Sequence, residues 1–194
     1  MSCYSWGVSL EECRRGAVLA KQPRTICSLR YARKGYYEED HVQRALERRR
    51  ERLSDPRWVD AMTLLLRDER YFRWFDTGDL LGLSHLCMIV EVCQRTPQCR
   101  HWLATREYGI VEQFVEQHQL PENLNIRLSA DFIDQDYPHT PVEGCTVSTV
   151  STAPRRDAHN CPASFGPFSK RSCELANCRA CWDRSVTKVN GRLH

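Results

Sequence analysis

The chain has 194 residues, of which 41% are hydrophobic and 27% charged, and its formal net charge at pH 7 is +3. This composition is typical of a globular domain with a hydrophobic core and excludes a disordered or fibrous chain. No apolar run approaches the roughly 20 residues that span a bilayer, and the first residues do not form a secretion signal. We therefore expect a cytoplasmic protein in a reducing environment, with no membrane partner.

The first 35 residues show no clear hydrophobic period, so we expect a loop or a ligand-bearing segment there. The apolar pattern then predicts a helix over residues 38–53. A second helix is predicted from Asp55-Pro56, because Asp can cap a helix and Pro suits the first helical position. The arginine-rich run at 48–52 is interpreted as the solvated face of the first helix, with a nucleic-acid contact as the alternative.

From residue 71 onward, short strands and helices alternate. Strands are predicted at 71–75, 100–104, 124–128 and 145–150, and helices at 84–93 and 110–117. This order indicates βα units and a parallel sheet. Buried parallel strands are usually continuous apolar runs, whereas polar residues interrupt these strands. A partial barrel that directs polar side chains into a site would explain them, and so would a mixed or partly exposed sheet. We predict an α/β domain over residues 1–152, with a parallel or mostly parallel sheet in a partial barrel.

Polar residues follow several of the predicted strands. In parallel α/β folds, sites gather at the carboxyl ends of strands. Acidic residues there can accept hydrogen bonds from a ribose or an amine, and an arginine can hold a carboxylate or phosphate. The candidate cofactor-binding residues are Asp76, Thr77, Asp79, Thr105, Arg106, Glu107 and Ser129. The alternative is that these residues cap turns or pair locally.

Residues 153–194 are basic, lack periodic structure and contain four closely spaced cysteines. We interpret this segment as a loop-rich, metal-binding tail that packs on the same domain. The predicted ligands are Cys161, Cys173, Cys178 and Cys181. In a reducing compartment, clustered cysteines are metal ligands more often than disulfides. Four thiolates bind either zinc or an iron–sulfur cluster, and the spacing does not choose between them.

The chain has eleven cysteines in total. Cys13 and Cys27 are candidates for a second metal site. The remaining five are interpreted as structural, and they are Cys3, Cys87, Cys93, Cys99 and Cys145. Both ends of the chain are basic and the middle is acidic. This charge can offset bound thiolates or contact a polyanion such as nucleic acid, with a solvated surface as the alternative.

Several motifs carry a family resemblance. They are Cys27-x-x-x-Tyr31-Ala32-x-x-Gly35-x-Tyr37, the runs 72–80 and 102–107, the run 120–129, and the cysteine-containing runs 161–164 and 178–183. With them, the chain resembles the bacteriophage gene product 88 family over nearly its whole length. That family is similar in layout to a reduced radical S-adenosylmethionine barrel. There, three N-terminal cysteines hold a 4Fe–4S cluster and leave one iron open for the cosubstrate. Cys13 and Cys27 match two of these positions, and Arg30 stands at the third.

The resemblance implies a phage iron–sulfur protein of radical-enzyme ancestry in the cytoplasm of the bacterial host. Its 4Fe–4S cluster would be held by the tail cysteines and would be structural or electron-transferring. One alternative is an active radical enzyme that binds S-adenosylmethionine and recruits an unexpected third ligand. Another is a zinc-stabilised module that binds a host protein or nucleic acid.

Overall fold

A seven-stranded sheet forms the centre of the computed structural model, which describes residues 3–29, 35–166 and 173–193. All neighbouring strands are parallel, in the order β1-β2-β3-β4-β5-β7-β6. The strands are β1 (Tyr4–Trp6), β2 (Tyr71–Trp74), β3 (Arg100–Thr105), β4 (Leu124–Ser129), β5 (Thr146–Ser151), β6 (His159–Asn160) and β7 (Lys188–Arg192). The predicted α/β fold with a parallel sheet of βα units is confirmed. The alternative of a mixed sheet is excluded for these seven strands, because none of their pairings is antiparallel.

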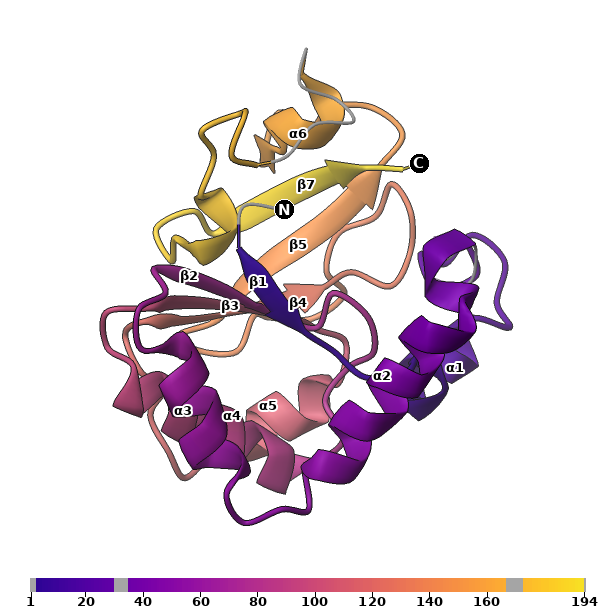
Figure 1. The fold of residues 1–194 in the computed structure, drawn as a ribbon. Helices are drawn as coiled ribbons and strands as arrows, with labels where there is room; N and C mark the ends of the chain where they lie inside the picture. The colour runs from indigo at the N-terminus through magenta and orange to yellow at the C-terminus, as the bar shows by residue number, and fades with distance from the viewer. Residues whose placement is uncertain (1–2, 30–34, 167–172, 194) are drawn as a thin grey trace.

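Most helices lie where the sequence pattern predicted them. The α-helices are α1 (Arg14–Leu19), α2 (Asp40–Arg52), α3 (Trp58–Leu66), α4 (Leu83–Arg95), α5 (Tyr108–Val115) and α6 (Pro162–Phe165), and the 3-10 helices are η1 (Leu10–Glu12), η3 (Gly35–Glu38) and η4 (Ala180–Trp182). Figure 1 shows α3, α4 and α5 on one side of the sheet. Their buried residues recur at helical spacing, as in α4, where Leu86, Ile89, Val90 and Cys93 face the core.

The expectation of a loop over the first 35 residues is wrong, because β1 and α1 lie within it, while a ligand-bearing role of this segment stays a prediction. A strand of three residues is too short to show an alternating pattern, and tertiary contacts hold it in place. The Trp6 ring centroid lies 5.7 Å from that of Trp58 and 6.2 Å from that of Trp74. The main-chain N–H of Phe75 also donates to the carbonyl oxygen of Trp6. These contacts attach β1 to the edge of the sheet.

Arg73 and Arg127 within the strands point away from the core helices, whereas the buried His101 stacks on Trp74 and lies 3.0 Å from the Thr96 hydroxyl after α4. Arg73, Trp102 and Arg127 alternate with buried apolar neighbours and lie on the opposite face of the sheet. There the Trp102 ring packs against Trp182 of η4, with centroids 5.3 Å apart. This face is therefore covered by the C-terminal segment, which explains why the strands are not continuous apolar runs.

Residues 153–194 contribute strands as well as loops. β7 pairs with β5 on one side and with β6 on the other. Asn190 of β7 is fully buried and makes hydrogen bonds to Thr149, Ser151 and Asn160. The tail is thus part of the sheet, held there by this ladder of side-chain hydrogen bonds between neighbouring strands. Such a ladder gives no hydrophobic period in the sequence.

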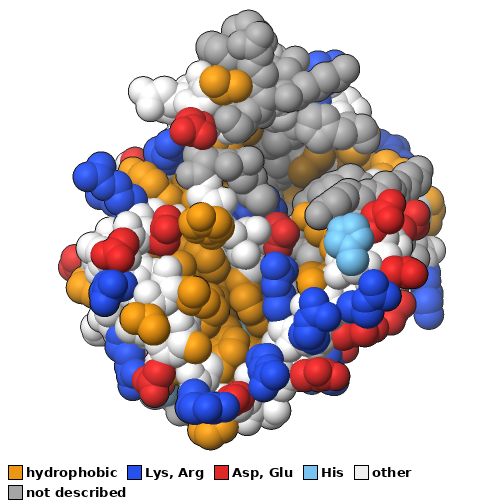
Figure 2. Space-filling model, in the orientation of Figure 1, with side chains coloured by type: hydrophobic (Ala, Val, Ile, Leu, Met, Phe, Trp, Pro, Cys, Tyr) orange, Lys and Arg blue, Asp and Glu red, His pale blue; other side chains and the backbone are white. Residues whose placement is uncertain are grey.

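The surface carries mixed charge. Figure 2 shows a band of hydrophobic side chains down the middle of one face, with acidic and basic side chains interspersed around it. Among the described side chains of this face there is no continuous basic surface of the kind that follows a nucleic-acid backbone. None of the helices in the described part of the chain has the length and apolar character needed to cross a bilayer.

Candidate functional site

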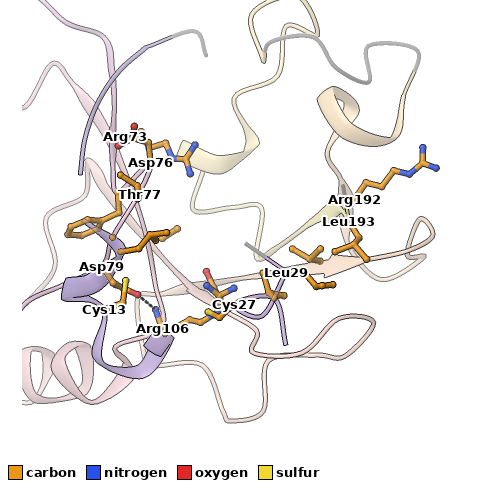
Figure 3. A pocket seen from close by; sticks show the side chains of 18 residues that line it. Cys13, Cys27, Leu29, Arg73, Asp76, Thr77, Asp79, Arg106, Arg192 and Leu193 are labelled. Atoms are coloured by element: carbon orange, nitrogen blue, oxygen red, sulfur yellow. Dashed lines mark hydrogen bonds between the residues drawn. The ribbon is translucent and has the colours of Figure 1, made fainter. Parts of the chain in front are cut away.

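A cavity of about 340 Å³ opens at the carboxyl ends of β2, β3, β4, β5 and β7. Figure 3 shows side chains from the N-terminal segment, the end of β2 and the C-terminal residues around it, with the Arg192 side chain pointing away. The lining residues are Leu10, Cys13, Gly16, Ile26, Cys27, Leu29, Arg73, Phe75, Asp76, Thr77, Gly78, Asp79, Ala104, Arg106, Ser129, Val150, Arg192 and Leu193. The wall combines apolar side chains with charges of both signs, which suits a small amphipathic ligand.

The loop after β2 brings its acidic residues to the cavity through two left-handed positions. Phe75 has φ +60° and Gly78 has φ +78°. A Cβ added to Gly78 would lie 2.5 Å from Cγ2 of Val8, so the loop and the chain after β1 are in close contact. Only glycine satisfies both the backbone angle and this approach. The left-handed backbone at Phe75 and Gly78 therefore positions Asp76 and Asp79 at the cavity.

Asp79 has the most strongly altered carboxyl group of the cavity. Its side chain accepts hydrogen bonds from the Thr105 hydroxyl and from the main-chain N–H groups of Leu80 and Arg106. Burial raises its pKa to about 6, although the three hydrogen bonds lower it, and the charge of Glu107 raises it further. A carboxyl group with this pKa changes charge near neutral pH and is suited to bind a cationic group or to move a proton.

The structure brings together five of the seven predicted cofactor-binding residues. Asp76, Thr77, Asp79, Arg106 and Ser129 line the cavity. The other two support them from outside. Thr105 holds the Asp79 carboxyl group, and Glu107 accepts a hydrogen bond of 2.9 Å from the main-chain N–H of Arg15 at the start of α1.

Cys13 and Cys27 also line this cavity, and both are buried. Cys13 directly precedes α1, which is fixed to the sheet by the Arg15 side chain. The Arg15 guanidinium pairs with Asp131 at 2.5 Å and lies over the Tyr108 ring. Arg30, at the third expected cysteine position, lies outside the described residues.

The four tail cysteines lie close enough for their charges to interact. The main-chain N–H of Cys178 donates to the carbonyl oxygen of Cys173 at 2.9 Å. Burial raises the pKa of the Cys173 thiol, and the charges of Cys161 and Cys178 raise it further. Burial raises the pKa of Cys181 to about 12; the charge of Arg127 lowers it, and those of Cys161 and Cys173 raise it. The structure therefore gathers the thiols that the sequence singled out.

Beneath this group lies Arg127, which is fully buried in β4. Its guanidinium donates only to main-chain carbonyl oxygens, which belong to Val147, Ala180, Cys181, Asp183 and Val186. Among the described residues it forms no ion pair with a carboxylate. A buried cation needs nearby negative charge or hydrogen-bond acceptors. Burial lowers the pKa of Arg127, while the charges of Cys181, Asp183 and Cys178 raise it. Arg127 therefore both clamps the tail and places positive charge beside the thiols.

The thiols are not already arranged around a single ion. Within residues 3–29, 35–166 and 173–193, no three His, Cys, Asp or Glu side chains form a group that could hold one metal ion. The chemistry of the donor set fits a thiolate-bound metal, since four sulfurs and adjacent arginines occur together. Binding would need the thiols to move toward a common centre.

Two side chains beside this group were not predicted as site residues. Nε2 of His159 lies 3.4 Å from Sγ of Cys178. The charges of Arg73 and Arg179 lower the pKa of the Cys3 thiol and that of Cys173 raises it. From the sequence, Cys3 was interpreted as structural. His159 lies within the tail in β6, and Cys3 precedes β1 at the far end of the chain, and no sequence motif signals either proximity.

Comparison with known proteins identifies the family. The sequence profile of Gene product 88 matches residues 4–184. The chain belongs to the Gene product 88 family. No curated protein and no solved structure matches the chain. Family membership, predicted from the motifs, is therefore confirmed. The similarity to radical S-adenosylmethionine barrels stays a prediction.

Proposed function

We propose that this Gene product 88 protein binds an iron–sulfur cluster, of the 4Fe–4S type, through Cys161, Cys173, Cys178 and Cys181. The observation that carries the proposal is the position of Arg127. Its buried guanidinium lies beside these thiols, and its charge lowers the pKa of Cys181. Thiolates bound to a cluster carry net negative charge, which this cation would balance.

A 4Fe–4S cluster and a single metal ion differ in how far apart their thiolate ligands stand. A 4Fe–4S cluster attaches each thiolate to a different iron, so its ligands stand further apart than four ligands of one zinc ion. The four tail cysteines supply the number of thiolates that such a cluster needs. When bound, the cluster would supply a cross-link within the tail and a centre for one-electron transfer. We place the protein in the cytoplasm of a bacterial host, where thiols stay reduced.

A second candidate function is catalysis with S-adenosylmethionine in the cavity. It is favoured by the presence of Cys13 and Cys27 in the same wall as Asp79 and Arg106. An acidic and a basic side chain there could hold the amine and carboxylate of that cosubstrate. Release of 5′-deoxyadenosine from S-adenosylmethionine in the presence of dithionite would favour this candidate over a structural cluster.

A third candidate is a zinc-stabilised module that binds a host protein or nucleic acid. The contact between His159 and Cys178 favours it, because zinc accepts mixed histidine and cysteine ligands. The interspersed surface charge in Figure 2 is less suited to nucleic acid than to a protein partner.

Anaerobic purification with metal and sulfide analysis tests the main proposal. We expect iron, sulfide and broad absorption near ~400 nm, all lost in Cys178→Ala/Cys181→Ala. The control variant is Cys87→Ala/Cys145→Ala, which also removes two thiols but from side chains packed on the core. It should keep the iron. Zinc in a colourless protein would instead favour the third candidate, and a wild-type protein free of both metals would refute metal binding by the tail.

A further inference from the structure

Cys3 lies at the amino end of the edge strand β1, far from the tail in sequence. The next residue, Tyr4, pairs with Phe72 of β2, so Cys3 lies level with Tyr71. Side chains alternate along a strand, and residues level with one another on parallel strands share a face. Trp6 and Trp74 pair on the helix-covered face. Cys3 and Tyr71 therefore lie on the other face, which the tail covers.

Tyr71 is in direct contact with the cysteine-bearing part of the tail. The Arg179 guanidinium lies over the Tyr71 ring, 5.1 Å from its centroid, and the Trp182 ring packs against it at 5.5 Å. The same guanidinium donates to the carbonyl oxygens of Cys173 and Cys178, at 3.2 and 2.8 Å. One arginine thus joins the start of β2, next to Cys3, to two of the tail cysteines.

The electrostatics of Cys3 agree with this placement. Burial raises the pKa of its thiol to about 11, Arg73 and Arg179 lower it, and the charge of Cys173 raises it. Besides stacking on Trp102 and Tyr71, Arg73 and Arg179 place positive charge near this half-buried thiol. They would stabilise a thiolate, which is the form that binds metal.

We propose that Cys3 is a ligand of the tail metal centre, on the side of Cys173, so that both ends of the chain hold one metal group. This inference rests on the function proposed above. The site then offers five thiols for four ligand positions, so Cys3 takes the place of one of the four tail cysteines named above. The edge strand β1, which has only three residues, would gain a covalent attachment to the tail.

The test compares Cys3→Ala with wild type and with the control Cys87→Ala. Each protein is reconstituted anaerobically with ferrous iron and sulfide, and in parallel with zinc chloride. Metal release to a chelator is then followed. We expect Cys3→Ala to release metal at least about tenfold faster than wild type, whereas Cys87→Ala should match wild type. Equal release from all three proteins would overturn the proposal.

Alkylation by iodoacetamide, read by mass spectrometry, locates the ligands directly. In the metal-loaded wild type we expect four of the five thiols to be protected, with Cys3 among them, and all five to react after metal removal. Complete labelling of Cys3 in the loaded protein would exclude it as a ligand while leaving the tail site intact. If wild type takes up neither metal, the proposed function itself fails, which is a distinct result.

Discussion

At the scale of single residues, Asp79 makes a prediction about pH. Its folded-state pKa of about 6 lies above the ordinary aspartate value of 3.8. The folded protein therefore binds a proton more tightly than the unfolded chain between these values. This contribution to stability is fully present below pH 4 and is lost as pH rises through 6. It amounts to about 3 kcal/mol at most, from 1.4 kcal/mol per pKa unit.

The measurement is urea unfolding of wild type and Asp79→Asn at several pH values. The variant carries no titrating carboxyl group there, so the stability of wild type relative to the variant should fall between pH 4 and 7. The control Asp68→Asn removes an exposed carboxyl group and should leave the pH dependence of wild type unchanged. A constant difference between wild type and Asp79→Asn would show that Asp79 titrates normally.

Single residues also show what the sequence can and cannot predict. Asp79 and Arg106 were found because polar residues after strands of a parallel sheet meet at one edge. The tail cysteines were found from their spacing. Cys3 and His159 were missed, because each depends on which strands pair across the sheet, and no local pattern encodes that. The supporting roles of Thr105 and Glu107 likewise follow from contacts distant in sequence.

At the scale of elements, α1 depends on one buried anchor. Asp131 holds the Arg15 side chain and also accepts from the Tyr108 hydroxyl. We expect Asp131→Asn to weaken this anchor and to loosen α1 together with Cys13. Hydrogen exchange should then rise over residues 13–29 and change little in β3 and β4. Asp60→Asn is the control, because its ion pair with Arg95 is exposed and of little energetic value. Unchanged exchange over residues 13–29 would contradict the anchoring role.

Element length decided which strands were predictable. The strands with at least four residues and a buried alternate face, β2 to β5, were predicted within a residue or two. β1 and β6 are too short for a pattern. β7 has a polar, glycine-containing sequence whose place in the sheet comes from the buried side chain of Asn190. Local propensity therefore located the central strands, and tertiary contacts determined the edges.

At the scale of the whole molecule, the two candidate sites share a neighbour, Arg73. The cavity lies at the carboxyl ends of the strands, whereas Arg179, which donates to the carbonyl oxygens of Cys173 and Cys178, lies over Tyr71 at the amino end of β2. Arg73 connects the two sites. Its side chain lines the cavity, and its guanidinium carbon lies 4.6 Å from the Trp102 ring centroid. Its charge lowers the pKa of Cys181 and of Cys3. A change of charge at the proposed metal centre would therefore alter the electrostatic potential at the cavity wall.

The same layout predicts how the molecule responds to metal removal. Hydrogen bonds from Arg127 and the packing of Trp182 on Trp102 hold the tail on one face of the sheet, so loss of the proposed metal should loosen the tail and lower the stability of the whole domain. We expect chelation to lower the Tm by at least several degrees, because about 1 kcal/mol shifts the Tm of a domain of this size by roughly 2–4 °C. Trypsin should then cut first in the tail at Arg179 and Arg184, while the strands from β2 to β4 stay protected. The variant Cys178→Ala/Cys181→Ala should melt at the same temperature with or without chelator, because it has no tail site to empty. A wild-type Tm that does not respond to complete metal removal would mean that the sheet and the Arg127 clamp hold the tail without help from a metal.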